Sequence, residues 1–469
     1  MKKILSGLLL SLILTVSAAQ DSLKTLSGQQ VTEIVKRFHP VAKQADILME
    51  KAKADLTIAR GLFDPTLENS NARKTFDGNE YYYYNRPELA VPTWFGIELR
   101  AGLEYLSGNR TDPTETRGES SYFGISVPLA KNLLMDKRRA ALQTAKIFRE
   151  ASAIEKRNIL NNLLQDALKA YWQWVADYQS YRILTEAVKV NEKRVALVKT
   201  AFRLGDRPAI DTAEALTQLQ SFEVLQSQAW LDFQNAGLEL SLYLWTANNQ
   251  PYYLPETILP ADELQQIRSS AFVLPELNAL LDDARKNHPE LLLYNYKLDA
   301  LGIEKKLKFQ ELLPTLNFKY NQLGKGYDIA KTAVAPLFEN NFQYGISMGI
   351  PLRLSQGRGE YRKAKLKITE TQLSQNQKQL ELENKVKSCF NELSALQQQL
   401  RIQEQAWINY AALQRGEETR FVAGESSLFL VNARENKALE AFQKLQELKA
   451  KYFKATIAIQ WAAGLLSGR

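Results

Sequence analysis

The longest regular pattern in the chain runs from Asp136 to Phe202, where about 67 residues contain neither proline nor glycine. Apolar residues recur along it at steps of three and four, which places them on one stripe of an α-helix. The stripe includes Leu160, Leu164, Ala167, Tyr171, Trp174 and Tyr178. Globular helices average about 11–12 residues, so this length is typical of a coiled coil, a membrane span or a helical repeat. The stretch is too polar to span a membrane, and we predict a long rod that packs against other helices.

A second rod is predicted from Glu360 to Phe421, with its own apolar stripe. Gly205 follows the first rod, Gly424 follows the second, and another helical stretch begins after each glycine. Glycine adopts the left-handed conformation that ends a helix at little cost. Each rod and the helix after it are therefore predicted to form a hairpin, at 136–245 and at 360–465.

Between the helical stretches the apolar pattern changes to a period of two, which indicates strands with one apolar and one polar face. The alternating runs are 97–105, 123–127, 316–320 and 342–350. They predict two pairs of strands, one within about 66–128 and one within about 314–351. Two readings of the first pair stay open, because its first membrane-spanning strand is either 66–76 or 94–106. The role of the insertion from Tyr81 to Trp94, which holds four tyrosines, also stays open.

The order of elements occurs twice, which indicates a duplicated unit rather than an array of short repeats. His39-Pro40 recurs 249 residues later as His288-Pro289, and Pro65-Thr66-Leu67 recurs as Pro314-Thr315-Leu316. We predict a signal peptide at 1–19, a first structural repeat at 20–246, a connector at 247–285 and a second structural repeat at 286–469.

The lengths of the helices predict how each half is arranged. In the first half, predicted helices at 31–61 and 210–245 together approximate the length of the long rod. In the second half, predicted helices at 286–313 and 428–465 do the same. Each pair of shorter helices is therefore expected to stack end to end beside its rod.

Four short strands with an apolar face need something to cover that face. A barrel wall in a membrane meets this need, because one face contacts lipid and the other a wet lumen. Bacterial barrels begin at eight strands, so a chain with four must oligomerise to close one. A soluble sandwich on a coiled-coil stalk is the alternative. In the barrel, Leu99, Leu103, Phe318 and Ile346 are expected to face lipid, and Glu98, Arg100, Lys319 and Gln343 the lumen.

The composition predicts that the protein is secreted, but it indicates no catalytic or ligand-binding chemistry. Lys2 and Lys3, an apolar run and Ser17-Ala18-Ala19 form a secretory signal that is expected to be cleaved near Ala19, without lipidation. The single cysteine, Cys389, lies on an apolar helical stripe and permits no intrachain disulfide. The formal charge of +8 is spread over mixed-sign faces, which does not indicate a nucleic-acid partner.

No residue pattern typical of an enzyme is present. His39 and His288 both precede prolines at equivalent places in the repeat, which favours helix starts over a metal site. No histidine and cysteine cluster suits zinc, and no glycine-rich loop suits phosphate. We therefore expect no catalytic residues, no metal and no cofactor.

The arrangement resembles the TolC-like outer membrane efflux protein family. The resemblance rests on the duplicated strand-pair and hairpin plan, on Pro-Leu before each rod, on the paired glycine turns and on the segment from Ala284 to Leu291. It implies a mainly α-helical protein with a β-barrel part, in which a homotrimer closes a twelve-stranded outer membrane barrel. It also implies a helical tunnel in the periplasm, met by an adaptor protein and an inner membrane pump.

The resemblance further implies that residues beside the glycine turns close the tunnel and contact the adaptor. Asp211 stands at the family's first gating aspartate, and Phe421 stands where a gating tyrosine is usual. The family's paired acidic positions fall on Leu430 and Ala433, so Asp211, Glu214 or Glu425 is expected to substitute for them. The expected adaptor contacts are Gly205, Asp206, Arg207, Gly424 and Ser426. The predicted function is a passive exit duct for efflux or type I secretion, and the alternative is a structural or adhesive envelope protein.

Overall fold

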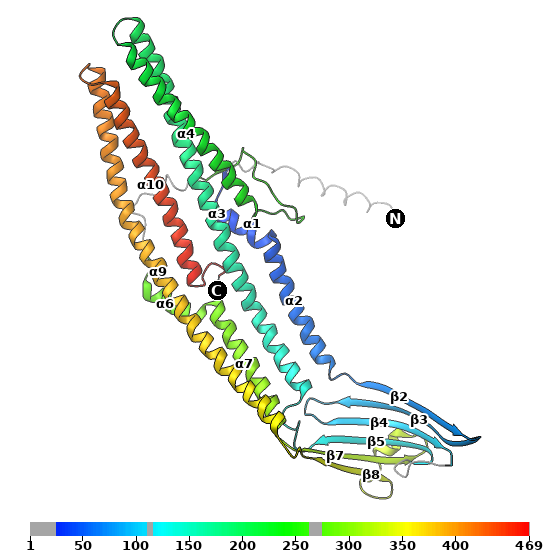
Figure 1. Cartoon of the computed structure of the whole chain (residues 1–469). Helices are drawn as coiled ribbons and strands as arrows, with labels where there is room; N and C mark the ends of the chain where they lie inside the picture. The colour runs from blue at the N-terminus through cyan, green and yellow to red at the C-terminus, as the bar shows by residue number, and fades with distance from the viewer. Residues whose placement is uncertain (1–24, 110–115, 262–273, 469) are drawn as a thin grey trace, which may run out of the picture. The chain divides into compact units, whose positions relative to one another are not determined.

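The computed structural model describes residues 25–109, 116–261 and 274–468 (Figure 1). The predicted signal peptide, part of the connector and part of the loop after residue 109 lie outside the described residues. The chain divides into two compact units. The first comprises Met1–Gln44, Ile159–Ala284 and Leu382–Arg469 within the described ranges, and the second comprises Ala45–Asn158 and Arg285–Glu381.

The two predicted rods are single helices, α3 (Lys137–Arg203) with 67 residues and α9 (Ser355–Val422) with 68 residues. After a short turn α3 is followed by α4 (Ala209–Ser241), and α9 is followed by α10 (Leu428–Ala462). Gly205 and Gly424 both adopt a positive φ, of 80° and 78°. Glycine enters this left-handed region at little cost, which explains why the hairpins turn at these residues.

The first unit is built on the apolar stripes of these helices. Leu164, Tyr171 and Trp174 of α3 are buried against Phe233 and Leu240 of α4. The helix α1 (Gly28–Phe38) adds Val31 and Val35 to this cluster. A second cluster joins α6 (Leu277–Asn287) to the C-terminal part of α9 and to α10, and it includes Cys389. The strands β1 (Thr25–Leu26) and β6 (Leu259–Pro260) pair in parallel, and Leu26 and Leu259 pack in the first cluster.

Each His-Pro pair begins a helix, as predicted. α2 (Pro40–Gly61) follows His39, and α7 (Pro289–Gln310) follows His288. In both cases the histidine Nδ1 accepts a hydrogen bond from the backbone N–H two residues later, at 3.2 Å. Burial lowers the pKa of both histidines, which favours the neutral ring that can accept this bond.

The helix predicted at 31–61 is wrong as a single element, because it is divided into α1 and α2. The helix predicted at 286–313 is the single helix α7, and its start is displaced because a separate helix, α6, ends just before His288. Proline lacks the backbone N–H that a continuous helix needs, and it drives the preceding residue to an extended conformation. His39 has φ −63° and ψ 135°, and His288 has φ −63° and ψ 125°.

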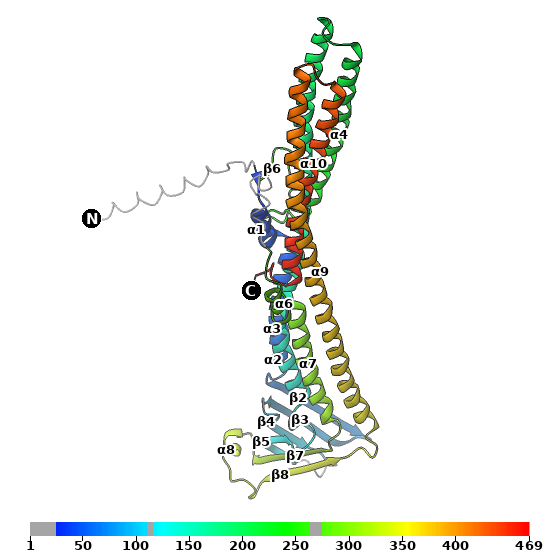
Figure 2. The same ribbon diagram turned by 90° about the vertical axis from the view of Figure 1, so that its left-hand side faces the viewer.

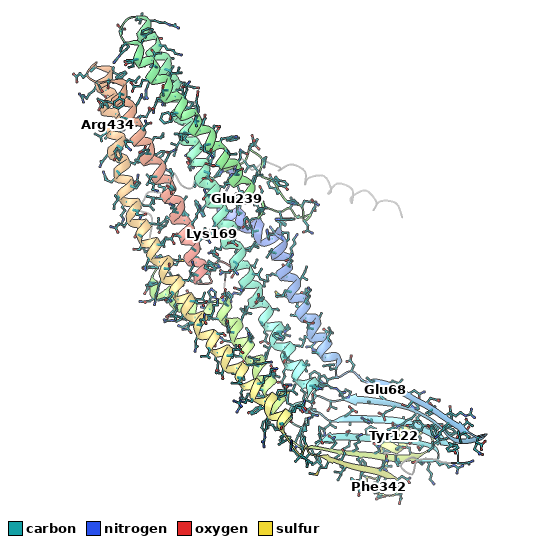
Figure 3. The ribbon with its side chains drawn as sticks, viewed as in Figure 1. Glu68, Tyr122, Lys169, Glu239, Phe342 and Arg434 are labelled. Atoms are coloured by element: carbon teal, nitrogen blue, oxygen red, sulfur yellow. The ribbon has the colours of Figure 1, made fainter. Side chains whose placement is uncertain are left out.

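The second unit holds the sheet, together with α2, α7 and the N-terminal parts of α3 and α9. All six strands of the sheet are antiparallel to their neighbours, in the order β2-β3-β4-β5-β7-β8 (Figure 1). The strands are β2 (Thr66–Phe76), β3 (Asn79–Pro92), β4 (Glu98–Ser107), β5 (Gly118–Pro128), β7 (Thr315–Lys325) and β8 (Phe342–Gly349). Figure 3 marks three of them with Glu68 on β2, Tyr122 on β5 and Phe342 on β8.

The prediction of four strands per chain is therefore wrong by one hairpin. Both candidates for the first strand are strands, and the tyrosine-rich insertion is β3, which joins them. The period-two alternation of apolar residues does not reveal this hairpin, because β2 is polar on both faces and β3 carries four consecutive tyrosines. Asp77 and Gly78 close it, both with positive φ, which suits the tight turn between adjacent strands.

The register of the sheet separates apolar from polar side chains. Directly opposed residues share a face, and Leu99 opposes Ile125, which opposes Tyr320, which opposes Tyr344. Leu103, Phe318 and Ile346 share this apolar face by the same alternation. Glu98, Arg100, Lys319 and Gln343 occupy the opposite, polar face. The grouping of these eight residues agrees with the sequence, while the assignment of faces to lipid and lumen stays a prediction.

The apolar face is not bare along its whole length. The short helix α8 (Ile329–Ala333), which the sequence analysis did not predict, lies against β5 and β7 (Figure 2). The Ser121 and Thr332 hydroxyls are 2.8 Å apart, and Ser121 also donates to the backbone oxygen of Asp328 at 3.3 Å. The segment between β7 and β8 therefore covers the end of the face near Ser121.

Candidate functional site

The two hairpin turns of the first unit are joined by one arginine. Arg207, just after Gly205, lies over the Phe421 ring at 4.1 Å from its centroid. The same guanidinium donates to the backbone oxygen of Phe421 at 3.1 Å. Asp211, in the first turn of α4, is 3.9 Å from Arg207. Three predicted residues, Arg207, Asp211 and Phe421, are thus brought together.

The contact between Arg207 and Phe421 does not depend on a side-chain hydroxyl at position 421. The backbone oxygen of Phe421 accepts the hydrogen bond, and its ring provides a face for the cation. Neither feature requires a hydroxyl on the ring. The sequence placed Arg207 only among the adaptor contacts, because nothing local shows that it reaches the other hairpin.

Glu214 lies on α4 one turn beyond Asp211 and accepts a hydrogen bond from Asn432 of α10 at 3.5 Å. Burial raises the pKa of Glu214, and the nearby Asp211 carboxylate raises it further. Two carboxylates on neighbouring turns repel each other, so protonation or a bound cation relieves the repulsion. Asp211 and Glu214 therefore form the acidic pair of the turn region.

Glu425 is exposed, and the structure does not bring its side chain to Asp211 or Phe421. Its backbone oxygen accepts from the Arg420 side chain at 3.3 Å, and its backbone N–H donates to the Arg420 backbone oxygen at 2.8 Å. Ser426 instead donates to the buried carboxylate of Glu417 at 2.6 Å, within its own hairpin. Asp206, Gly205 and Gly424 lie exposed in the turns, where an adaptor contact remains a prediction.

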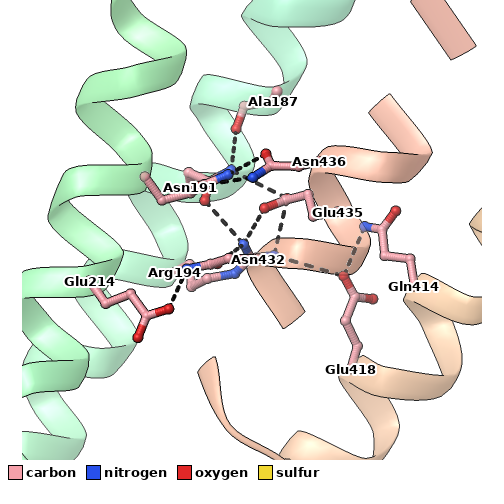
Figure 4. A network of polar contacts seen from close by, with 10 residues as sticks. Ala187, Asn191, Arg194, Glu214, Gln414, Glu418, Asn432, Glu435 and Asn436 are labelled. Atoms are coloured by element: carbon pink, nitrogen blue, oxygen red, sulfur yellow. Dashed lines mark hydrogen bonds and ion pairs between the residues drawn. The ribbon is translucent and has the colours of Figure 1, made fainter. Parts of the chain in front are cut away.

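A buried polar network that the sequence analysis missed joins α3 to α10 (Figure 4). Arg194 of α3 forms an ion pair with Glu435 of α10, and their side chains are 13% and 8% exposed. Asn191 donates to Glu435 at 3.3 Å, and Arg194 donates to Asn432 at 3.3 Å. Glu418 of α9 lies 3.8 Å from Arg194 at the edge of the network.

One signal in the sequence points to this ion pair. Arg194 stands 11 residues before Gly205, and Glu435 stands 11 residues after Gly424. In two hairpins of equal rise, residues at equal distances from the turns lie at the same level. Opposite charges at matched distances are therefore expected to meet. Nearby, Gln218 of α4 donates to Asn436 of α10 at 2.6 Å, which adds a second link between the hairpins.

The polar face of the sheet carries a connected set of charges. Arg100 forms hydrogen bonds to Glu98 at 2.6 and 2.9 Å and lies 3.5 Å from Glu88. Arg86 of β3 lies 3.3 Å from Glu88 and donates to the Tyr122 hydroxyl at 2.8 Å. The structure thus adds Arg86 and Glu88, from the hairpin that the sequence analysis left open.

Lys319 and Gln343 line a cavity of about 280 Å³ on this face, together with Arg86 and Arg100. Glu98 lies beside the cavity and is held by Arg100 and, at 3.6 Å, by Arg138. All four predicted residues of the polar face therefore lie in or beside one cluster. Within the described ranges, no group of three or more histidine, cysteine or acidic residues is arranged to hold a metal ion.

The described helices give no membrane span. None of those within residues 25–109, 116–261 and 274–468 combines the length and the apolar character needed to cross a bilayer.

Antiparallel helical hairpins and a sheet with separated faces define a mainly α-helical protein with a β-barrel part. Residues 280–465 match the family model described as outer membrane efflux protein. Over those residues the chain is similar to the outer membrane efflux protein family, and the resemblance predicted from the sequence is confirmed. No curated protein matches the chain by sequence.

Solved outer membrane proteins share the fold of nearly the whole chain. The CmeC outer membrane channel of Campylobacter jejuni is 15% identical with a TM-score of 0.63, over 93% of this chain and 85% of that one. The MtrE outer membrane channel of Neisseria gonorrhoeae, in its open state, is 13% identical with a TM-score of 0.65, over 94% and 90%. VceC of Vibrio cholerae is 14% identical with a TM-score of 0.62, over 93% and 96%.

Proposed function

We propose that the protein is the outer membrane exit duct of a tripartite efflux or type I secretion system. Three copies surround one passage, with the sheets forming the barrel wall and the helical hairpins forming a periplasmic tunnel. A periplasmic adaptor contacts the glycine turns, and an inner membrane pump delivers the cargo. The signal peptide directs secretion of the chain, which then inserts into the outer membrane.

The separation of the two sheet faces carries this proposal. A membrane barrel needs an apolar outer face and permits a charged lumen, and this alternation occurs on β4, β5, β7 and β8. Several apolar side chains on β8 are largely exposed, including Ile346 at 63% and Met348 at 73%. A structural or adhesive stalk would not need such a face. The exposed apolar face of β8 therefore favours the duct over the stalk.

The sheet also has two strands with only one partner each, β2 and β8. Pairing β8 of one copy with β2 of the next removes both edges, which membrane barrels require. Three copies of this six-stranded sheet contribute eighteen strands rather than twelve. The outward residues of β2 beyond Leu67 are Asn69, Asn71, Arg73 and Thr75, so most of this strand extends the wall past the apolar band.

Recording from purified protein in planar bilayers tests the duct. We expect discrete channels of low resting conductance, which open further when a contact at the hairpin turns is removed. Absence of conductance from the parent protein and from a Phe421→Ala variant would favour the structural alternative. Co-purification of an adaptor with the parent protein tests the assembly separately.

Neighbouring residues on β8 test the direction of the two faces. Ile346→Arg places a charge on the face assigned to lipid and is expected to cost about 2–4 kcal/mol if it lies near the bilayer midplane. Ser347→Arg is the matched control, because Ser347 is exposed and points to the polar face. Folding into lipid vesicles, followed by urea titration, measures both. A larger cost for Ser347→Arg would reverse the assignment.

A further inference from the structure

The cavity of about 280 Å³ on the polar face is lined by basic and not by acidic side chains, although carboxylates lie on the same face. Three cations line it, Arg86, Arg100 and Lys319. Asn321, Gln343 and Ser126 add amide and hydroxyl groups, and none of its lining residues is acidic. We call these six residues the basic pocket.

Five strands build this pocket, and Arg86 is the residue that β3 contributes. Arg100 of β4, Gly124 of β5, Asn321 of β7 and Gln343 of β8 lie in one row across the sheet. Lys319 lies in the neighbouring row, between Ser126 and Gly345. Gly124 leaves the space that the Asn321 amide fills, since a Cβ there would overlap Asn321 and approach the Tyr320 backbone oxygen at 2.6 Å.

The two arginines of the pocket are held in place by groups outside its lining. Glu98 binds Arg100 through two hydrogen bonds, and Glu88 lies 3.3 Å from Arg86 and 3.5 Å from Arg100. Tyr122 accepts from Arg86 and donates to Glu88 at 2.5 Å. The guanidinium groups are thus fixed before any ligand arrives, which lowers the entropy lost on binding.

Lys319 differs from the arginines. It is exposed, and within the part of the chain that the structure describes no carboxylate pairs with it. Three cations against Glu88 and Glu98 leave the cluster with a net charge of +1. An ammonium group beside fixed guanidinium and amide donors is suited to an oxyanion, which accepts several charge-assisted hydrogen bonds.

We propose that the basic pocket binds oxyanion groups of the phosphate class and gives the barrel a preference for anionic cargo. Lys319 supplies the free charge, while Asn321 and Gln343 supply amide donors. The preference of the barrel rests on the proposed function, because the pocket faces the passage only if the polar face lines a lumen. In a trimer the pocket occurs three times around that passage, and grouped charges of one sign raise the local concentration of counter-ions.

Binding is tested first without conduction, on the full-length protein in detergent with inorganic phosphate as the probe. Phosphorus NMR line broadening reports binding to the parent protein. Lys319→Gln is expected to weaken the apparent affinity by about ten-fold, because it removes one charge-assisted hydrogen bond. Lys319→Arg keeps the charge and is expected to retain binding.

Lys325→Gln is the matched control. Lys325 is exposed on the same strand and points to the same face, but it lies six residues away and outside the pocket. Its replacement is expected to leave phosphate binding unchanged. Absence of broadening in the parent protein, or equal affinity for the parent and Lys319→Gln, would overturn the proposed pocket.

Reversal potentials across a potassium chloride gradient then test the selectivity. We expect the parent channel to favour chloride over potassium, Lys319→Gln to reduce this preference, and Lys325→Gln to leave it nearly unchanged at high salt, where distant charges are screened. Conduction without phosphate binding would overturn the pocket and leave the duct intact. Phosphate binding without conduction would support the pocket and contradict the duct.

Discussion

Glu435→Ala is expected to lower the free energy of unfolding of the helical unit by about 3 kcal/mol. The replacement leaves the Arg194 guanidinium buried without its ion-pair partner, and that side chain is only 13% exposed. Removing one member of a buried pair costs about 3–5 kcal/mol, because the remaining charge has lost its compensation. We expect a cost at the lower end of this range, because Glu418 at 3.8 Å and the Asn432 oxygen at 3.3 Å still contact Arg194.

The matched control lies on the same helix. Glu440 pairs with Lys437 at 2.8 Å, and their side chains are 63% and 59% exposed. Exposed pairs contribute about 0–1 kcal/mol, so Glu440→Ala is expected to change little. Urea unfolding followed by helical circular dichroism in detergent measures both variants. Equal shifts for Glu435→Ala and Glu440→Ala would contradict the role assigned to the buried network.

A double variant separates loss of the ion pair from loss of packing. Arg194→Met with Glu435→Leu replaces both charges by apolar side chains of similar size. Such replacements of buried pairs are often neutral or stabilising. The double variant is therefore expected to be more stable than Glu435→Ala alone. A double variant that is less stable would show that the polar contacts with Asn191 and Asn432 dominate.

Arg207→Ala is expected to give the largest rise in resting conductance of any single change at the hairpin turns. It removes the stacking on Phe421, the hydrogen bond to the Phe421 backbone oxygen and the ion pair with Asp211. Together these contacts are worth roughly 2 kcal/mol, which shifts the ratio of closed to open turns by about thirty-fold. Single-channel recording of the purified protein measures the open fraction.

Phe421→Ala is expected to have a smaller effect than Arg207→Ala. The variant loses the ring but keeps the backbone oxygen that accepts from Arg207. Arg203→Ala is the control, because Arg203 is an exposed arginine in the last turn of α3. An effect of Phe421→Ala larger than that of Arg207→Ala would show that the ring closes the passage sterically and that the arginine contact is secondary.

Asp211→Ala tests the acidic pair of Asp211 and Glu214, and it also removes the ion pair with Arg207. Three copies of Asp211 and Glu214 around one axis would attract cations, so the parent channel is expected to be blocked by divalent and trivalent ions. Asp211→Ala should weaken that block and raise the resting conductance, whereas Phe421→Ala should leave the block unchanged. Unaltered block and conductance in Asp211→Ala would place the gate elsewhere.

The sequence by itself determined the elements whose pattern is strong and local. The rods followed from long helical stripes, the turns at Gly205 and Gly424 from the need for a left-handed residue, and the helix starts at His39 and His288 from the proline after each. The separation of Leu99 from Arg100, and of Ile346 from Lys319, followed from an alternation of period two. Each of these features depends on neighbouring residues only, which a sequence displays directly.

The tertiary structure decided the features that depend on which strands and helices meet. The hairpin of β2 and β3 escaped prediction because its pairing with β4, rather than its own alternation, makes it part of the sheet. Arg207 reaches Phe421 across 214 positions, and Arg194 reaches Glu435 across 241. The basic pocket requires Arg86 from β3, Arg100 from β4 and Lys319 from β7 on one face. Such contacts arise from packing between distant segments, and local residue patterns do not specify them.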